Sequence, residues 1–430
     1  MKDFVLKGNI CYSVTPAEIA TRGNAYVVCK DGKSVGVFDS LPSEYADFDL
    51  KDFGDKLIIP GLIDLHIHAS QYAYRGLGMD LELLDWLQKY AFPEEAKFAS
   101  EEYADKAYSI FADRMTKSAT TRACIFATRH RIGTEILMDK MEKSGLITYV
   151  GKVNMDREAP DIIREESAAF SASETEKWIE ESEKLFKNTK PIITPRFVPS
   201  CTDALMENLG RIQKKYGVAV QSHVSENLSE IEFVHALRPR NEFYGDVYDE
   251  YGLFGRDYEN DKPVKTVMSH CIWSNDTEVE LMKKNGVFVC HCPASNMNVA
   301  SGIAPVRAYL EKGLKVGLGS DVAGGQCESI FRAMTDAIQN SKLRWRLVDQ
   351  SLAPLTFEEA FYMATKGGGE FFGKVGSFEE GYEFDAVVLD DSNAPHPQPL
   401  NVLQRLERSA YLGVDLSGVA AKFVAGQRIV

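Results

Sequence analysis

The sequence lacks any apolar run of the roughly 18 residues that a membrane-spanning helix needs. Its opening segment, MKDFVLKGNI, has no apolar stretch followed by a small-residue cleavage site, so we expect no secretion signal. Positive charge is also scarce, with 49 Lys and Arg against 63 Asp and Glu and a net charge of −14. Because such a surface repels phosphate groups, we expect neither a membrane nor a nucleic acid as a partner.

Cysteine is sparse and scattered along the chain. The eight Cys among 430 residues follow none of the spacings of a small disulfide framework, so we expect reduced thiols and a cytoplasmic location. The composition, 44% hydrophobic and 26% charged, is typical of a soluble globular protein. The length predicts roughly one large domain with a smaller one.

Eight short apolar runs predict buried parallel strands. They are residues 57–68, 121–126, 147–153, 191–198, 218–224, 266–271, 287–291 and 316–320. Helical patterns with polar starts lie between them, at residues 80–89, 100–117, 134–143, 174–187, 202–216, 277–285 and 305–311. This alternation predicts an α/β fold of the (β/α)8 barrel type. The alternative is a doubly wound open sheet. Such a sheet usually has a Gly-rich phosphate-binding turn after its first strand, whereas the first predicted strand of this chain ends in His-Ile-His.

The two chain ends carry short strand-like pieces with turn signals. These are residues 4–10, 24–29, 34–38, 386–389, 409–412 and 421–424. Neither end is long enough to make a good core alone, so we expect residues 1–58 and 378–430 to pair into one small composite β-sandwich. The barrel domain would then be residues 59–377. The least regular stretch, residues 238–262, is a candidate active-site loop.

Residues with metal-binding or proton-transfer chemistry fall at the carboxyl ends of four predicted strands, the end where such barrels carry their active sites. They are His66 and His68 on strand one, His223 and Glu226 at strand five, His270 at strand six and Asp321 at strand eight. Each alone has an ordinary explanation, such as a buried polar residue or a helix cap. Their joint occurrence at one end of a barrel predicts a metal site.

The His-x-His pair directs both imidazoles to one face, because side chains alternate along a strand. Three imidazoles and a carboxylate suit Zn²⁺, and Fe²⁺ accepts the same set. The open position would hold water, whose pKa the metal lowers. Asp321 can accept the proton of that water, and Glu226 can carry a proton to the substrate. The pattern therefore predicts a metal-dependent hydrolase.

Several motifs resemble the amidohydrolase superfamily. Residues 60–68, PGLIDLHIH, are similar to its strand-one signature, and residues 69–72, ASQY, are similar to the narrower group of guanine deaminases. Further matches are GKV at 151–153, PRF at 195–197, QSHVSE at 221–226, HCP at 291–293 and GSDVAGG at 319–325. The resemblance spans essentially the whole chain, and the combination is specific although each fragment alone is not.

The resemblance implies a distorted (β/α)8 barrel with a composite β-sandwich made by both chain ends. It also implies hydrolytic deamination of guanine to xanthine and ammonia in purine catabolism, by a cytosolic homodimer with one zinc per chain. Carried over by position, the metal ligands are His66, His68, His223 and Asp321. The catalytic residues are Glu226 as the proton shuttle, His270 at the attacking water, and Asp321.

The resemblance also implies a guanine site formed by Gln71, Arg196, Phe197, His223, Glu226 and Asp321. Arg196 suits the carbonyl side of guanine because arginine only donates hydrogen bonds. An amine in place of that carbonyl would leave buried donors facing each other. Asn154 departs from the pattern, since the family usually has Cys there, and we expect it to tune the pocket.

Three alternatives stay open at this point. One is a deaminase or chlorohydrolase of the same superfamily that acts on another amino-heterocycle. A second is an amide or ring-opening hydrolase with two metals bridged by a carboxylated lysine. That enzyme needs a lysine at the end of strand four, and this chain has Arg196 there. The third is a non-catalytic, metal-stabilised scaffold, which would often have lost a ligand or Glu226.

Overall fold

The computed structural model describes residues 3–430 and is built around a barrel of parallel strands. These strands are β5 (Leu62–His68), β6 (Thr120–Phe126), β7 (Ile147–Gly151), β9 (Thr189–Pro195), β10 (Ala219–Val224), β13 (Thr266–His270), β14 (Phe288–His291) and β15 (Lys315–Leu318), with β8 (Val153–Asn154) beside β9. The chain after β15 closes the barrel against β5. There the Asp321 amide donates to the His66 carbonyl at 2.8 Å, and the His68 amide donates to the Val322 carbonyl at 2.8 Å. The predicted (β/α)8 barrel is confirmed, and the doubly wound alternative is wrong.

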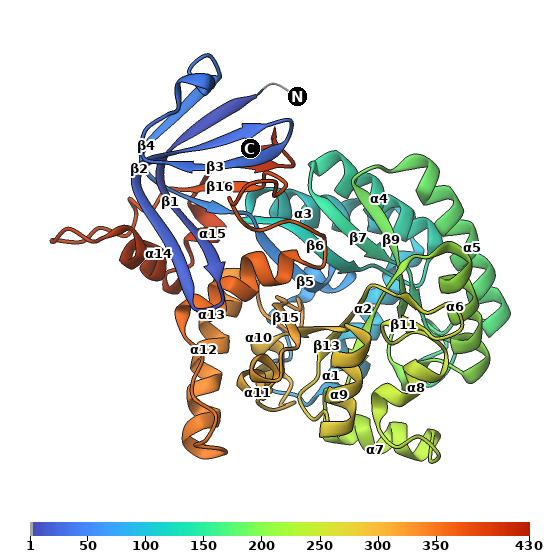
Figure 1. Ribbon diagram of the computed structural model, residues 1–430. Coiled ribbons are helices and arrows are strands. Elements are labelled where there is room, and N and C mark those ends of the chain that lie inside the picture. Colours follow the sequence, from blue (N-terminus) through green and yellow to red (C-terminus); the bar gives the residue numbers. More distant parts are fainter. Residues whose placement is uncertain (1–2) are drawn as a thin grey trace.

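Helices surround the barrel strands (Figure 1). They are α1 (Leu83–Trp86), α2 (Phe92–Ala96), α3 (Glu101–Lys117), α4 (Arg131–Ser144), α5 (Ala168–Leu185), α6 (Asp203–Tyr216), α7 (Leu228–Leu237), α8 (Tyr244–Glu250), α9 (Asp276–Asn285), α10 (Pro293–Asn298), α11 (Val306–Glu311), α12 (Ile330–Leu347), α13 (Phe357–Tyr362), α14 (Val402–Tyr411) and α15 (Val414–Ser417). Local sequence sets their limits. The side chains of Ser100 and Thr202 accept first-turn amides of α3 and α6, and Gly217 ends α6 in the left-handed conformation.

Both chain ends join in a second sheet of seven strands, in the order β18-β17-β16-β4-β1-β2-β3, beside the barrel (Figure 1). Its strands are β1 (Phe4–Thr15), β2 (Glu18–Lys30), β3 (Lys33–Phe38), β4 (Asp49–Pro60), β16 (Ala386–Leu389), β17 (Val419–Val424) and β18 (Gln427–Arg428). The ring of Phe4 packs 5.1 Å from that of Phe423 and 5.3 Å from that of Phe384, so residues distant in sequence share one core. The β-structure predicted from both chain ends is confirmed, while the domain limits at residues 58 and 378 stay a prediction.

Two predicted strands need correction. The run 57–68 is not one strand, because β4 ends in the second sheet at Pro60 and β5 begins in the barrel at Leu62. Gly61 lies at the junction, where a Cβ atom would be only 2.1 Å from the Thr121 hydroxyl oxygen. Residues 409–412 are not a strand but lie at the end of α14, which begins with a capping box at Asn401.

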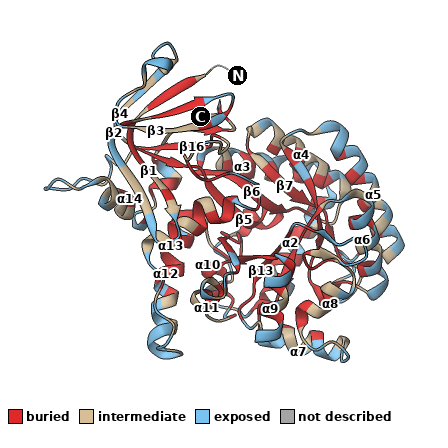
Figure 2. Ribbon diagram, in the orientation of Figure 1, coloured by how far each residue is buried: buried red, intermediate tan, exposed pale blue. Residues whose placement is uncertain are grey.

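Burial follows the layers of the barrel (Figure 2). Strands β5, β6 and β10 are buried at every position, as expected for strands covered on both faces. Within residues 3–430, no helix is both long and apolar enough to cross a membrane. The polar side chains at the carboxyl ends of the strands, such as His66, His270 and Asp321, are buried as well.

Candidate active site

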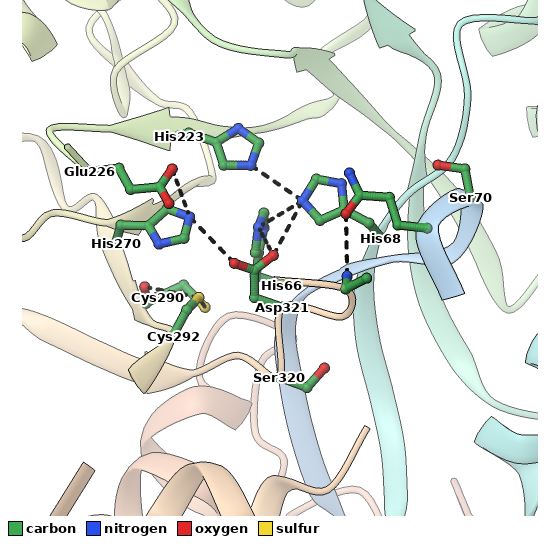
Figure 3. Close-up of polar contacts among 12 residues, drawn as sticks. His66, His68, Ser70, His223, Glu226, His270, Cys290, Cys292, Ser320 and Asp321 are labelled. Atoms are coloured by element: carbon green, nitrogen blue, oxygen red, sulfur yellow. Dashed lines mark hydrogen bonds and ion pairs between the residues drawn. The ribbon is translucent and has the colours of Figure 1, made fainter. Parts of the chain in front are cut away.

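Three imidazoles and a carboxylate meet at the carboxyl ends of β5 and β10 and just after β15 (Figure 3). The Nε2 atom of His68 lies 3.1 Å from Nε2 of His66 and 3.3 Å from Nε2 of His223. The Oδ1 atom of Asp321 lies 3.1 Å from Nε2 of His66 and 3.4 Å from Nε2 of His68. The structure thus brings the four predicted metal ligands together.

The chemistry of these four side chains fits a divalent metal ion. Burial lowers the pKa of His68 to about 4 and also lowers the pKa values of His66 and His223, which favours the neutral imidazoles that bind metals. Burial opposes ionisation of Asp321, but the imidazoles beside it hold the pKa of its carboxyl well below its usual range. The Nδ1 atom of His223 lies 2.5 Å from the Arg196 carbonyl oxygen, which orients the ring.

A second group of possible metal donors shares two of these residues. It combines His66, His270, Cys292 and Asp321, whose ligand atoms lie within 4.8 Å of one another. Burial raises the pKa of the Cys292 thiol well above its usual range, which disfavours the thiolate form. The set of three histidines with Asp321 therefore fits Zn²⁺ better than the set that needs a thiolate.

Glu226 and His270 lie on one side of this group. The Oε2 atom of Glu226 is 3.5 Å from Nε2 of His270, which is 3.7 Å from Oδ2 of Asp321. The other ring nitrogen of His270, Nδ1, is 2.9 Å from the side-chain oxygen of Asn296. Burial raises the pKa of Glu226 well above its usual range, and the charge of Asp321 adds to this effect. The two carboxyl groups are therefore suited to different protonation states in one pocket.

The backbone is strained where several of these side chains leave their strands. Ser225, His270 and Asp321 have φ angles of +49°, +73° and +46°, in the left-handed region that non-glycine residues seldom adopt. Each such residue costs on the order of 1 kcal/mol or more and persists where the surrounding structure compensates for it. Strain of this kind concentrates at functional sites, which agrees with the position of these residues.

A cavity opens over the carboxyl group of Asp321. It is lined by His68, Gln71, Leu83, Trp86, Leu87, Arg196, Phe197, His223, Glu226, His270, Ser295, Asp321 and Gly324. All of the predicted substrate-binding residues are among them. Sequence reasoning missed the apolar wall of Leu83, Trp86 and Leu87, although it predicted a helix there. No lysine lines this cavity in the part of the chain that the structure describes, which counts against a lysine-bridged metal pair.

Gln71 and Arg196 share a partner that sequence reasoning also missed. The Gln71 side-chain amide donates to Oε1 of Glu95 at 2.7 Å, and Nη1 of Arg196 donates to Oε2 of the same carboxylate at 2.5 Å. The Arg196 guanidinium also lies 5.0 Å from the centre of the Phe92 ring. The sequence gave no signal for this contact, because Glu95 stands beside the charged residues Glu94 and Lys97.

Two predicted contributions to the pocket are wrong. Residues 238–262 do not line the cavity, and instead Tyr244 donates a hydrogen bond at 2.7 Å to Glu230 behind it. Asn154 is turned away from the pocket, and its amide donates to Ser171 and Thr175 of α5 at 2.8 Å each. Both stretches therefore support the site from behind.

A barrel of this kind, with histidine and aspartate ligands at its strand ends, defines a class of metal-dependent hydrolases. The comparisons with known proteins agree, because residues 57–427 match the amidohydrolase family and the chain belongs to that family.

Several of its similar relatives within the family are guanine deaminases. The chain is 34% identical to the guanine deaminase of Dictyostelium discoideum over 455 aligned positions, which cover 99% of this chain and 98% of the relative. It is 37% identical to the guanine deaminase of Mus musculus, with coverage of 87% and 83%. Among solved structures, the guanine deaminase of C. acetobutylicum with bound guanine superposes with a TM-score of 0.95, at 46% identity and with 100% of both chains covered.

Proposed function

We propose that this protein is a zinc-dependent guanine deaminase that converts guanine and water into xanthine and ammonia. One observation carries the proposal: a single cavity is lined on one side by His68, His223, Asp321 and Glu226 and on another by Gln71 and Arg196. His66 lies behind the first set, with its Nε2 atom 3.1 Å from Nε2 of His68 and from Oδ1 of Asp321. The first set is suited to hydrolysis, and the second is suited to a purine that carries a ring carbonyl. The guanine deaminases among its relatives support the same reaction.

The four ligand side chains would hold one Zn²⁺, with Fe²⁺ as the alternative ion. When bound, the ion lowers the pKa of the attacking water toward neutrality. Asp321 is placed to accept the proton from that water, because its second oxygen, Oδ2, faces His270 and not His66. His270, oriented by Asn296, is placed to hydrogen-bond the same water.

Glu226 is suited to deliver a proton to the substrate. Burial raises the pKa of its carboxyl group well above the usual range, which favours the protonated form, and the Ser301 hydroxyl donates to its Oε1 atom at 3.3 Å. A proton given to the ring nitrogen next to the attacked carbon makes that carbon more electrophilic. The proton that Asp321 takes from the water can then pass to the amine, which leaves as ammonia. The departing group then carries no negative charge. The new hydroxyl group returns a proton to Glu226 as it becomes the second carbonyl of xanthine.

Arg196 and Gln71 would recognise the part of guanine that does not react. Arginine donates only, so it pairs with the ring carbonyl and disfavours an amine at that position. Phe197, Leu83 and Trp86 offer apolar surfaces for the flat purine ring. These contacts predict a preference for guanine over adenine.

A substrate panel measured with the metal content of the same sample tests this function. Zinc-loaded protein should convert guanine into xanthine, followed by ultraviolet absorbance, and should act poorly on adenine, cytosine and amino-triazines. Turnover of another amino-heterocycle without turnover of guanine would refute the substrate but keep the reaction class. No turnover of any member would favour the scaffold alternative.

We further propose that the protein is a cytoplasmic homodimer. Eight cysteines are free, and seven of them are buried, which suits a reducing compartment. The end of α12 and the residue after it expose Leu343, Leu347 and Val348, at 48%, 75% and 62% of their surface, and contact with a second copy would cover them. Light scattering after gel filtration measures this, and a monomer at micromolar concentration would refute it.

A further inference from the structure

Glu95 has a buried carboxylate that contacts two of the residues that line the cavity. Its side chain belongs to α2 and is only 1% exposed. A buried carboxylate is costly unless charged or polar partners satisfy it. Its two oxygens bind one residue each, Gln71 and Arg196, which come from separate parts of the barrel mouth. Glu95 therefore connects the two polar residues that face the unreactive side of the substrate.

The contact with Glu95 decides which way the Gln71 amide faces. A carboxylate only accepts hydrogen bonds, so the NH₂ group must face Glu95. On the opposite side, the Ala323 backbone amide donates to the Gln71 carbonyl oxygen at 3.2 Å. Rotation of the amide by 180° would set donor against donor and acceptor against acceptor. One amide hydrogen and one oxygen lone pair of Gln71 thus remain, in a fixed orientation, for a ligand.

The same carboxylate also fixes the charge and position of Arg196. It is the only carboxylate within 4.0 Å of that guanidinium among residues 3–430. The pairing neutralises a positive charge that lies beside an uncharged substrate site, which avoids selection for anions. Phe92, one turn before Glu95 in sequence, lies against the guanidinium, so α2 supports it through two side chains.

We propose that Glu95 is a positioning residue that sets the selectivity of this site for a cyclic amide, the C=O and adjacent N–H of the guanine ring. Arg196 supplies donors for the carbonyl, and the fixed Gln71 amide supplies one donor and one acceptor for the same edge of the ring. Glu95 does not line the cavity, so it acts through these two residues. The inference rests on the proposed function and deepens it.

The chain offers a matched control in the neighbouring residue. Glu94 lies on the same short helix and is also buried, with 7% of its surface exposed. Its partners are Lys97, at 2.5 Å, and the Tyr103 hydroxyl, both of which lie away from the cavity. A Glu94→Gln change removes the same charge from the same helix without touching Gln71 or Arg196.

The test compares Glu95→Gln and Glu94→Gln with the wild type on guanine and on 2,6-diaminopurine, which has an amine in place of the carbonyl. For Glu95→Gln we expect KM for guanine to rise at least 10-fold while kcat stays within about threefold, since the metal group and Glu226 are untouched. The guanine-to-diaminopurine ratio of kcat/KM should fall at least 10-fold. Glu94→Gln should leave the KM and the ratio within twofold of the wild type.

Bound zinc and the melting temperature of each variant separate selectivity from folding. If Glu95→Gln does not fold, Glu95→Asp takes its place. This variant keeps the negative charge on a side chain that is one methylene shorter, and the guanine-to-diaminopurine ratio of kcat/KM should fall by a smaller factor. An unchanged ratio in a folded variant overturns the proposal, and so does failure of both variants to fold, because the role is then structural. The double variant with Arg196→Gln should lose little beyond the larger single effect, and full additivity also overturns it.

The wild-type control distinguishes the two proposals. If the wild type deaminates guanine but Glu95→Gln behaves like Glu94→Gln, the role of Glu95 is wrong and the function stands. If the zinc-loaded wild type does not act on guanine, the function is wrong, and the assignment of Glu95 to guanine selectivity is wrong with it.

Discussion

Two carboxyl groups in this pocket have opposite surroundings. Asp321 lies against His66 and His68, which favour its ionised form. The carboxyl group of Glu226 accepts the Ser301 hydroxyl and lies 3.5 Å from His270. Burial outweighs the effects of Ser301 and of the Arg196 charge and raises the pKa of Glu226, which favours the protonated form. Environments that separate two pKa values in this way assign acid and base roles to chemically similar groups. The protonated group here is the one farther from the metal-binding nitrogens.

Replacement of Glu226 by Gln tests this role. The Glu226→Gln protein should fold and keep its zinc, because this side chain is outside the proposed ligand set. Its kcat for guanine should fall at least about 100-fold, since the amide cannot transfer a proton. Steady-state kinetics with metal analysis measures both effects. Glu232→Gln, an exposed change on the next helix, is the control and should be neutral. A Glu226→Gln rate equal to that of the wild type would contradict the shuttle role.

Metal removal is the second prediction at this scale. Buried imidazole nitrogens within 3.1–3.3 Å of one another, beside a carboxylate, are best satisfied by a shared cation. A chelator should therefore abolish activity and lower the melting temperature, because an ion bound only to the folded state stabilises it by about 2.7 kcal/mol at 100 times its Kd. Added Zn²⁺ should restore both. A chelated protein that is metal-free by elemental analysis yet melts unchanged would contradict the ligand assignment.

At the scale of elements, the site depends on how the first and last barrel strands meet. The buried carboxylate of Asp64 on β5 accepts the Ser320 amide at 3.0 Å, the Ser320 hydroxyl at 2.5 Å and the His66 amide at 3.1 Å. It thereby ties β5 to the segment after β15, where Asp321 follows. The Asp64 side chain therefore helps to hold His66 and Asp321, two proposed metal ligands from opposite ends of the barrel sequence, next to each other.

Replacement of Asp64 by Ala should weaken both the fold and the metal site. Three buried donors would lose their acceptor, so we expect a loss of about 2–3 kcal/mol in unfolding free energy. Zinc affinity should fall about 10-fold or more, as for other partners of metal ligands. Ser320→Ala, which removes one donor and leaves the carboxylate, should cost about 1 kcal/mol. Denaturant unfolding and zinc titration measure these effects, and equal zinc affinity in the wild type and Asp64→Ala would refute the link.

The elements differ in how far sequence predicts them. The barrel strands and the residues at their ends were predictable because buried parallel strands are continuous apolar runs, and His66 or Asp321 stands out at the end of one. The apolar cavity wall could not be predicted in this way, because it depends on a π-helical turn, η3 (Leu87–Ala91), which lies between α1 and α2. The extra residue in such a turn changes which side chains share a face, so a 3.6-residue period does not place Trp86 or Glu95.

In the whole molecule, two buried basic side chains on either side of the junction join the end sheet to the barrel. Arg122 of β6 donates to Asp385 at 2.7 Å, next to β16 of the end sheet. Lys422 of β17 is fully buried and donates to the backbone carbonyls of Met115, Ser118 and Thr120 at 2.8–2.9 Å. Met115 lies in the last turn of α3, where its carbonyl also accepts the Ser118 hydroxyl at 3.0 Å, and Ser118 is the C-cap of that helix. The distant chain end thus completes the hydrogen bonding of a barrel helix.

The burial of Lys422 predicts a pH dependence of stability. Burial lowers the pKa of Lys422 from its usual 10.5 to about 7, and the nearby charge of Asp385 only partly opposes this shift. Between these two pH values the unfolded chain binds a proton that the folded chain does not. Stability therefore rises with pH across this window, by up to a few kcal/mol from this one group.

A Lys422→Met variant isolates this effect from the other groups that titrate over the same range. It removes the Lys422 donor from three carbonyls at every pH, which lowers stability by a constant amount, and it has no amine to titrate. The wild type should therefore gain stability relative to Lys422→Met as the pH rises from 7 to 10. Urea unfolding at several pH values, with zinc saturating, measures the difference. A difference that is flat or shrinks with pH would mean that the folded protein keeps Lys422 charged, held by its three carbonyls.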